Sequence, residues 1–203
     1  MKGSEDDEDD RWMDIRVSGD VVSSTLGVAQ AYRFTNRTEH DVAPYLLHID
    51  LAELSYLVDA LTEEQLRYEL GPEEFRKEQL NRLRLLQENI RWMRRNADIL
   101  QEWGEYGFGR RRYADEDGIK SCSLQVIKTC REFRYGARAV QLQLHLWFFR
   151  MKFFPARPAP MLSRARQVDG FDLLFAYQSV RIAAEYLSQA YGDDCFEDLA
   201  EVL

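Results

Sequence analysis

The sequence predicts an all-α fold, an antiparallel helical bundle of four to five main helices behind a disordered acidic N-terminal tail. Three observations lead to this fold class. Glycine (11) and proline (5) are sparse among the 203 residues, which favours long elements with few turns. Apolar side chains recur three and four residues apart through the middle of the chain. The apolar share of 45% is ordinary for a globular protein, so the chain is able to bury a core.

The first ten residues, MKGSEDDEDD, carry one lysine and six acidic side chains. Such a run has nothing to bury, so we expect residues 1–19 to be a disordered acidic tail and residues 20–203 to form a single helical-bundle domain. The run also lacks the apolar character of a secretory leader, and the three cysteines have no evident pairing. We therefore expect an intracellular protein, cytoplasmic or nuclear, without a transmembrane segment.

Two helices are predicted between the tail and the middle of the chain, after a weakly helical stretch that begins at Asp20. Residues 44–61 have leucines at helical spacing and Pro44 in the first turn, which indicates an amphipathic helix. Thr62 and the acidic residues after it match a capping box, so a short second helix should follow and stop at residues 71–72. The expected inward face of the first helix is Leu46, Leu47, Leu51, Leu54, Leu57 or Val58, and Leu61.

The strongest helical pattern lies at residues 72–103. This stretch begins with a proline and two glutamates, which suit a helix N-terminus. Its apolar residues form a coiled-coil-like seam, typical of helices packed on long antiparallel neighbours. The seam consists of Leu83, Leu86, Ile90, Met93, Ala97, Leu100 and Trp103. We expect Gly104, Gly107 and Gly109 to end this helix and to form the corner of a hairpin.

A second long helix is predicted from about residues 115–117 to residue 154. Its C-terminal half is apolar nearly all round, which is typical of a helix buried at the centre of a bundle. Three prolines between residues 155 and 160 end it. Its expected inward side chains are Ile119, Cys122, Val126, Cys130, Phe133, Val140, Leu144, Trp147 and Met151.

The last long helix is predicted over residues 168–191, with Val168, Phe171, Phe175, Ile182 and Tyr186 on its inward face. The chain then ends in FEDLAEVL, at residues 196–203. This segment has the spacing of acidic segments that fold into a groove of another protein, although such an end more often docks on its own bundle. The residues that would contact a partner are Phe196, Leu199 and Leu203.

The stretch GEYGFGRRRY, residues 104–113, raises the question of a phosphate-binding loop. A phosphate loop normally follows a strand and leads into a helix with a lysine and a hydroxyl residue, whereas a helix precedes these glycines. We interpret the stretch as a connecting turn. Its arginines, Arg110, Arg111 and Arg112, lie close in sequence to Tyr106 and Phe108, and arginine with interleaved aromatics suits RNA, phosphorylated lipid headgroups or an acidic partner.

The charges are unevenly distributed. Residues 75–166 carry twenty basic and nine acidic side chains, a net charge of +11, between acidic segments on both sides. Basic stripes at helical spacing run along both long helices: Arg91, Arg94 and Arg95 on the first, and Arg131, Arg134 and Arg138 on the second. They would serve either as a surface for nucleic acid or anionic lipid, or as partners of the acidic segments at residues 44–70 and at the C-terminus. The similar amounts of acid and base favour internal pairing.

Patterns of catalytic or metal-binding residues are lacking. The sequence has no Gly-x-Ser-x-Gly, His-Glu-x-x-His or Walker pattern, and no Glu-x-x-His pair for a di-iron bundle. His48 and Asp50 would point about 200° apart on a helix, so they cannot share an ion there, and we expect His145 to pack in the core. We therefore expect no catalytic residue, no metal and no cofactor.

Together these features predict a non-enzymatic helical adaptor or subunit that binds another protein. The alternative is a binder of anionic surfaces, either RNA or acidic membrane lipids, through the basic segment 91–138. In both readings the candidate contact residues include Arg110, Arg111, Arg112, Tyr106, Phe108, Arg91, Arg94 and Arg95.

Overall fold

A computed structural model describes residues 42–109, 117–154, 157–168 and 170–192, together with residues 195, 197 and 199. All of them belong to one compact unit, Phe34–Leu203. Five α-helices pack against one another in this part of the chain, which confirms the all-α bundle. The predicted boundary between residues 19 and 20 lies outside the described residues, as does the weakly helical stretch that begins at Asp20.

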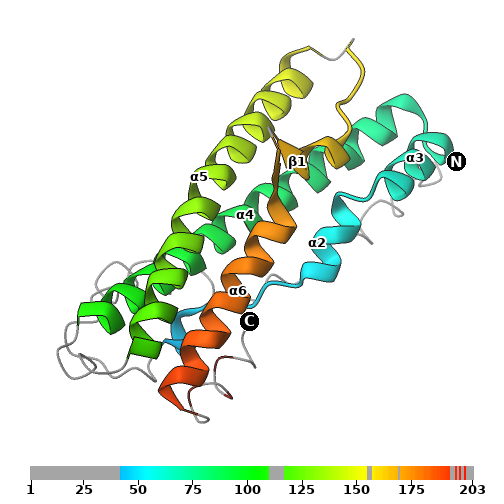
Figure 1. Cartoon of the computed structure of the whole chain (residues 1–203). Coiled ribbons are helices and arrows are strands. Elements are labelled where there is room, and N and C mark those ends of the chain that lie inside the picture. Colours follow the sequence, from blue (N-terminus) through cyan, green and yellow to red (C-terminus); the bar gives the residue numbers. More distant parts are fainter. Residues whose placement is uncertain are drawn as a thin grey trace, which may run out of the picture. The chain divides into compact units, whose positions relative to one another are not determined.

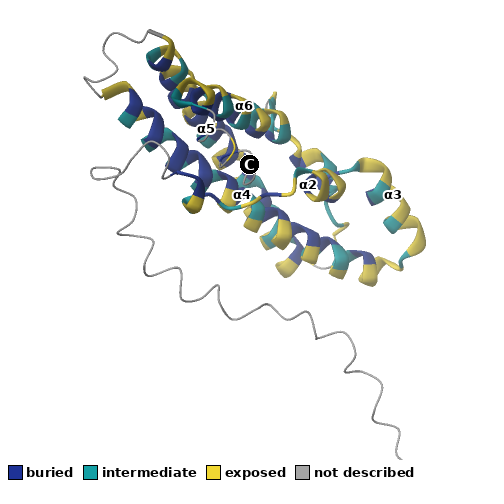
Figure 2. Cartoon of the chain, turned by 90° about the horizontal axis from the view of Figure 1, so that it is seen from below, coloured by how far each residue is buried: buried dark blue, intermediate teal, exposed yellow. Residues whose placement is uncertain are grey.

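The core of the bundle is a hairpin of two long helices. Figure 1 shows α4 (Pro72–Gly109) and α5 (Asp117–Phe153) antiparallel and side by side, with α6 (Leu173–Tyr191) along α5. Buried residues gather where these three helices face one another (Figure 2). The predicted seam of α4 is confirmed, because all seven of its side chains, from Leu83 to Trp103, have no exposed surface.

The predicted end of the first long helix at residue 103 is wrong. The structure continues α4 through Gly109, so two of the three glycines serve packing rather than chain reversal. A Cβ on Gly104 would lie 3.2 Å from the carbonyl oxygen of Ser123 in α5, and one on Gly107 would lie 2.8 Å from the Ser123 hydroxyl. The missing side chains therefore let α4 and α5 approach closely at this end. The connection between the helices, residues 110–116, lies outside the described residues.

The single helix predicted over residues 44–61 is also wrong. A 3₁₀ turn, η3 (Ala43–Tyr45), is followed by non-helical backbone, and then by α2 (Leu51–Leu57) and α3 (Ala60–Glu69). Two aspartates begin the new helices: Asp50 accepts hydrogen bonds from the amides of residues 52 and 53, and Asp59 from the amide of Thr62. Leu47 stays outside a helix because its amide and carbonyl both pair with the side chain of Asn96 in α4.

The start of α3 differs from the predicted capping box. Asp59, not Thr62, is the N-cap, and the Thr62 hydroxyl donates to the Asp59 carboxylate at 2.8 Å. These hydrogen bonds to Thr62 lower the pKa of Asp59. Leu61, predicted to face inward, is exposed, whereas Leu54, Leu57 and Val58 are buried as expected. The predicted stop at residues 71–72 is confirmed, since α3 ends at Glu69 and α4 begins at Pro72.

The segment before α6 contains a β-hairpin that the sequence pattern did not indicate. Strands β1 (Gln167–Val168) and β2 (Phe171–Asp172) pair antiparallel around Gly170, which has a φ of 80°. A 3₁₀ turn, η5 (Leu162–Ala165), precedes them, and Asp172 caps α6 by accepting from the amide of Phe175. Helix α6 therefore begins at Leu173, five residues later than predicted. Its predicted inward face is wrong, because Phe175, Ile182 and Tyr186 are exposed. The buried side chains of α6 are Leu173, Tyr177, Val180, Ala183, Ala184, Leu187 and Ser188.

The β-hairpin meets α5 at Gly136, which gives a first test of the packing. A Cβ at this position would lie 2.3 Å from two ring carbons of Phe171, a ring that packs on Phe133 with 6.3 Å between centroids. We expect Gly136→Ala to lower the free energy of unfolding by about 1–2 kcal/mol. Overpacking costs about 1–3 kcal/mol, which exceeds the gain of at most about 1 kcal/mol from the better helix former.

Gly118, near the start of the same helix, provides the matched control. No atom lies within 4 Å of a Cβ at Gly118, so Gly118→Ala should be neutral or stabilising by up to about 1 kcal/mol. Urea unfolding followed by circular dichroism measures both variants. Equal effects of the two substitutions would contradict the packing assigned to Phe171.

Candidate functional site

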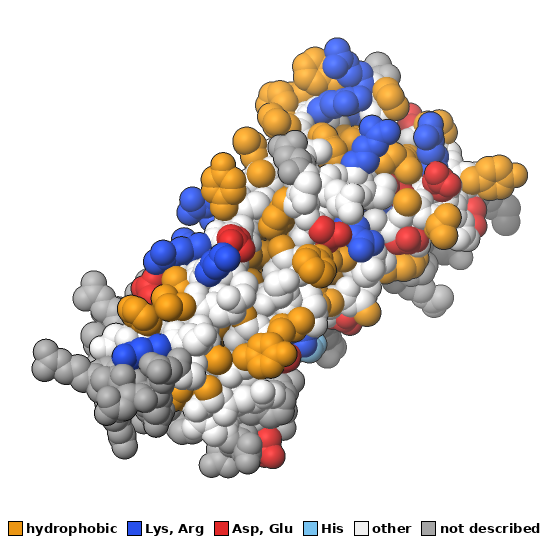
Figure 3. Space-filling model, in the orientation of Figure 1, with side chains coloured by type: hydrophobic (Ala, Val, Ile, Leu, Met, Phe, Trp, Pro, Cys, Tyr) orange, Lys and Arg blue, Asp and Glu red, His pale blue; other side chains and the backbone are white. Residues whose placement is uncertain are grey.

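The outer face of α5 carries a row of exposed apolar side chains. Their exposed fractions are 82% for Tyr135, 64% for Leu142, 62% for Leu146, and 56% each for Phe149 and Phe153. With the exposed Ala139, these residues form what we call the α5 stripe, spaced four, three, four, three and four residues apart. Figure 3 shows the row of hydrophobic side chains along the outer edge of α5. The prediction that the C-terminal half of this helix is buried all round is therefore wrong.

The α5 stripe lies opposite a second apolar seam on the same helix. The inward seam is fully or nearly fully buried and contains Val126, Cys130, Phe133, Ala137, Val140, Leu144 and Met151. Most members of the stripe follow a member of the inward seam by two residues, which is about 200° around a helix. One seam therefore packs against α4 and α6 while the other faces away from them. Among the predicted inward residues, Cys122 and Trp147 are only half-buried.

Basic side chains border the α5 stripe along one flank. Arg131, Arg138, His145 and Lys152 are seven residues apart and all exposed. If the residues of the α5 stripe are assigned to the two seam positions of a heptad repeat, all four basic residues fall at the same position, directly beside the seam. After Glu132, helix α5 contains no acidic residue. The exposure of His145 corrects the prediction that it packs in the core; its Nδ1 lies 2.6 Å from the carbonyl oxygen of Gln141.

Aromatic side chains dominate the C-terminal end of the α5 stripe. The rings of Phe149 and Phe153 are 4.4 Å apart between centroids, and the ammonium of Lys152 lies 5.9 Å from the Phe153 ring centroid. Phe154, directly after the helix, is half exposed as well. Side chains of this kind, with large apolar area and few rotatable bonds, are the usual anchors of protein interfaces.

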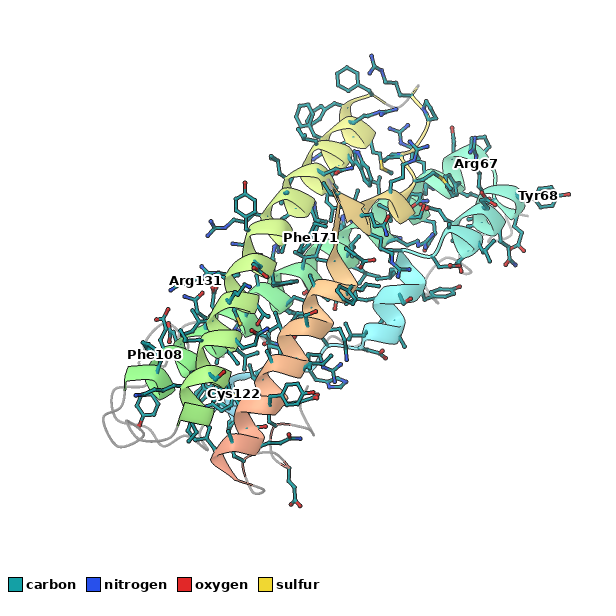
Figure 4. All side chains as sticks on the ribbon, viewed as in Figure 1. Arg67, Tyr68, Phe108, Cys122, Arg131 and Phe171 are labelled. Carbon is teal, nitrogen blue, oxygen red and sulfur yellow. The ribbon has the colours of Figure 1, made fainter. Side chains whose placement is uncertain are left out.

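The residues singled out from the sequence do not form one cluster. Arg91 is exposed, whereas Arg94 and Arg95 are half-buried, and Arg94 donates to the side-chain oxygen of Gln141. At the other end of α4, Phe108 is exposed and Tyr106 is half-buried. Figure 4 labels Phe108 near this end of the helix. Arg91 and Phe108 are 17 residues apart on one helix, which is about 25 Å. Arg110, Arg111 and Arg112 lie outside the described residues, so their role stays a prediction.

Two arginines of the predicted basic stripe on α5 are paired within the hairpin. Arg134 contacts the carboxylate of Asp98 at 2.6 Å, and Arg131 contacts that of Glu105 at 3.3 Å. Burial raises the pKa of the neighbouring Glu102, and the charges of Asp98 and Glu105 add to the rise. Internal pairing is thus present, but these acids belong to α4 rather than to residues 44–70.

The C-terminal candidate residues divide between described and undescribed positions. Leu199 has no exposed surface, and Cys195, one turn earlier, is buried too. Leu199 therefore has no surface to offer a partner, which corrects its assignment to a partner-binding surface. Phe196 and Leu203 lie outside the described residues.

Cys130 and the arrangement of possible metal ligands bear on the chemistry of the described part of the chain. Burial raises the pKa of Cys130 to about 12, so its thiol is protonated at neutral pH and unsuited to act as a nucleophile. Within the described ranges, no three His, Cys, Asp or Glu side chains come close enough to hold a metal ion. None of the described helices has the uninterrupted apolar length that crossing a bilayer requires.

The α5 stripe was missed in the sequence because two opposite seams on one helix give the same pattern as a helix buried on every side. The basic residue at every seventh position of α5 indicated an exposed face, since a helix buried on every side would not carry a charged residue at that spacing. Comparison with models of known protein families, with curated proteins and with solved structures finds no match to this chain.

Proposed function

We propose that the protein is a non-enzymatic helical adaptor, or subunit of a complex, that binds an amphipathic helix of a partner protein along the α5 stripe. The observation that carries this proposal is the exposed heptad seam between Tyr135 and Phe153. Heptad spacing is the pattern by which helices pack on one another. The seam spans 18 residues, about 27 Å, which is enough for a partner helix of some five turns.

The apolar area of the stripe is sufficient for a specific complex. Completing the burial of half-exposed Leu or Phe side chains gains on the order of 1 kcal/mol each. The five large side chains of the stripe and a matching set on the partner would together gain about 10 kcal/mol. Association itself costs at least about 4 kcal/mol, so we expect a dissociation constant in the micromolar range.

The charges beside the stripe favour a partner helix with acidic residues at its flanking positions. Arg138, His145 and Lys152 lie along one flank, and Arg150 lies on the other. Two copies of this chain paired antiparallel along their stripes would bring like-charged flanks together, which opposes self-association. A partner helix with glutamates or aspartates at its flanking positions would instead form ion pairs along the seam. We therefore expect a different protein, with an acidic amphipathic helix.

The alternative function, binding of RNA or acidic lipids through residues 91–138, has weaker support. Arg131 and Arg134 already contact carboxylates of α4, and the side chain of Arg94 bonds to Gln141. These contacts leave fewer guanidinium groups for phosphates. The alternative predicts that the protein binds RNA or acidic vesicles at low salt. It also predicts that this binding is lost when Arg91 and Arg138 are changed to glutamine.

Two synthetic peptides test the adaptor proposal directly. Both are 28 residues long with leucine at the seam positions, and they differ only at the flanking positions, which are glutamate in one and lysine in the other. Like charges keep each peptide from pairing with itself. In calorimetric titration we expect the glutamate peptide to bind with micromolar affinity and the lysine peptide to bind at least tenfold more weakly. Failure of the glutamate peptide to bind would refute the proposal.

Matched variants then locate the binding surface. Leu146→Ser with Phe149→Ser should weaken binding of the glutamate peptide at least tenfold, because it removes two large side chains from the centre of the stripe. Phe175→Ser with Ile182→Ser makes the same kind of change on the exposed face of α6 and should leave the affinity within twofold. If the α6 variant loses as much affinity as the α5 variant, the stripe is not the site.

A further inference from the structure

A cavity of about 750 Å³ lies where α4 begins and α5 ends. Its wall comes from four stretches that are far apart in sequence: the end of α3, the start of α4, the end of α5, and residues 157–164. Five arginines line it, and we call them the arginine pocket: Arg67, Arg76, Arg150, Arg157 and Arg164. Figure 4 labels Arg67 at the α3 side. Phe75 and Trp147 add an apolar part to the wall.

No acidic residue is among the described side chains that line the arginine pocket. Arg67, Arg150, Arg157 and Arg164 have no carboxylate partner in the described part of the chain, in contrast to Arg131, Arg134 and Arg166. Like charges gathered in one place repel one another, and a protein of net charge −8 has acids enough to neutralise them. Because no acidic side chain lines the pocket, we expect a ligand to supply the negative charge that balances the arginines.

The pocket is held in place by the fold. The guanidinium of Arg76 donates to the carbonyl oxygen of Met151, and that of Arg150 to the carbonyl oxygen of Pro158 at 3.3 Å. Arg157 stacks over the ring of Phe154, 5.5 Å from its centroid. These contacts fix the positions of three guanidinium groups before any ligand arrives, which lowers the entropic cost of binding.

We infer that the arginine pocket binds a small polyanion with two or more phosphate groups. Guanidinium groups bind phosphate oxygens in pairs with charge-assisted hydrogen bonds, and arginine is the residue that such sites use most. The cavity volume falls within the range of small-ligand sites, and Phe75 and Trp147 offer a surface to the uncharged part of a ligand. The same chemistry is found in free polyphosphate compounds and in phosphorylated lipid headgroups. None of the apolar residues of the α5 stripe lines this pocket, although Arg150 lies at the edge of both. The inference therefore does not depend on the adaptor proposal.

The first test uses inorganic tripolyphosphate as the probe, in calorimetric titrations of the full chain at low salt. We expect micromolar affinity for the unchanged protein and at least a tenfold loss in the double variant Arg67→Gln, Arg164→Gln. Both side chains are exposed, so the thermal midpoint without ligand should stay nearly the same. Arg157→Gln, also exposed, serves as a second variant and should lower the affinity several-fold.

The matched control removes two arginines elsewhere. Arg91→Gln with Arg138→Gln makes the same change in net charge on exposed positions outside the cavity and should leave the tripolyphosphate affinity within twofold. An equal loss in this control would mean that tripolyphosphate binds through general attraction to the basic segment. That result, or no binding of tripolyphosphate and of vesicles alike, would overturn the inference.

A second arm identifies the source of the phosphates. Co-sedimentation is measured with two kinds of phosphatidylcholine vesicle. The first contains 5% phosphatidylinositol bisphosphate, and the second contains enough phosphatidylserine to carry the same total charge. Binding to the first kind alone, competed by tripolyphosphate and lost in the Arg67 and Arg164 variant, assigns the site to a lipid headgroup. Binding of tripolyphosphate without either kind of vesicle assigns it to a free compound. Both results support a polyphosphate site.

Discussion

Replacing Asn96 by alanine is expected to lower the free energy of unfolding by about 3 kcal/mol. The Asn96 side chain has no exposed surface and makes three hydrogen bonds. Its oxygen accepts from the amide of Leu47 at 2.9 Å, and its amide nitrogen donates to the Leu47 carbonyl at 2.7 Å and to the Tyr177 hydroxyl at 2.9 Å. Alanine would leave these three groups without their partner, and each buried group left so costs about 1–3 kcal/mol.

Asn89, on the same helix, is the control for the Asn96 variant. Its side chain donates to the carbonyl oxygen of Leu85, one turn earlier in α4, and makes no other hydrogen bond within the described residues. Asn89→Ala should change the stability by less than about 0.5 kcal/mol, because alanine is also the better helix former. Urea unfolding of both variants gives the comparison. A loss of less than 1 kcal/mol for Asn96→Ala would show that the contact with Leu47 is not needed to hold the segment before α2.

The second large effect is expected for Glu63→Ala, which should also lower the free energy of unfolding by about 3 kcal/mol. The Glu63 carboxylate is fully buried and accepts from the side-chain amide of Gln79 at 2.5 Å and from the backbone amides of Leu162 and Ser163, the latter at 2.9 Å. Hydrogen bonds to a charged group contribute about 1.5–3 kcal/mol, partly offset by the cost of burying the charge. The substitution leaves one side-chain and two backbone donors without an acceptor.

Unlike Asn96→Ala, the Glu63 variant should act locally on η5 and the residues before it. We expect faster cleavage of residues 157–166 in limited proteolysis, and weaker tripolyphosphate binding because Arg164 belongs to η5. Glu64→Ala, at the exposed neighbouring position, should change stability by no more than about 0.5 kcal/mol and leave cleavage unaltered. If Glu64→Ala and Glu63→Ala behave alike, the carboxylate of Glu63 does not anchor η5.

The long helices were predictable because their signal is local. Seven apolar residues at three- and four-residue steps define one face of α4 whatever the rest of the chain does, and all seven are buried. The division of residues 44–61 was not predictable in this way. Its leucines continue at helical spacing across Asp50 and Asp59, and the side chain that keeps Leu47 out of the helix belongs to Asn96, 49 residues away.

Predicting the two candidate sites from the sequence would have required knowledge of contacts between distant residues even more than predicting the helices did. The apolar pattern of α5 is the same whether one face or two are covered, so the exposure of Leu142 and Leu146 follows only from the number of neighbours that the fold provides. The arginine pocket collects residues from position 67 to position 164. In the sequence these arginines are indistinguishable from Arg131 and Arg134, which the fold pairs with carboxylates.

The order of the two longest helices has a consequence for the speed of folding. Because α4 and α5 follow one another along the chain, the largest contact between helices in the described part of the bundle joins elements that are consecutive in sequence. Closing a short loop costs little chain entropy, and helical bundles, whose contacts are mostly local in sequence, fold within milliseconds or faster. The hairpin therefore offers a nucleus on which α6 and the segment around Leu47 assemble afterwards. During synthesis, residues up to the end of α5 suffice to build it before the C-terminal quarter of the chain has emerged.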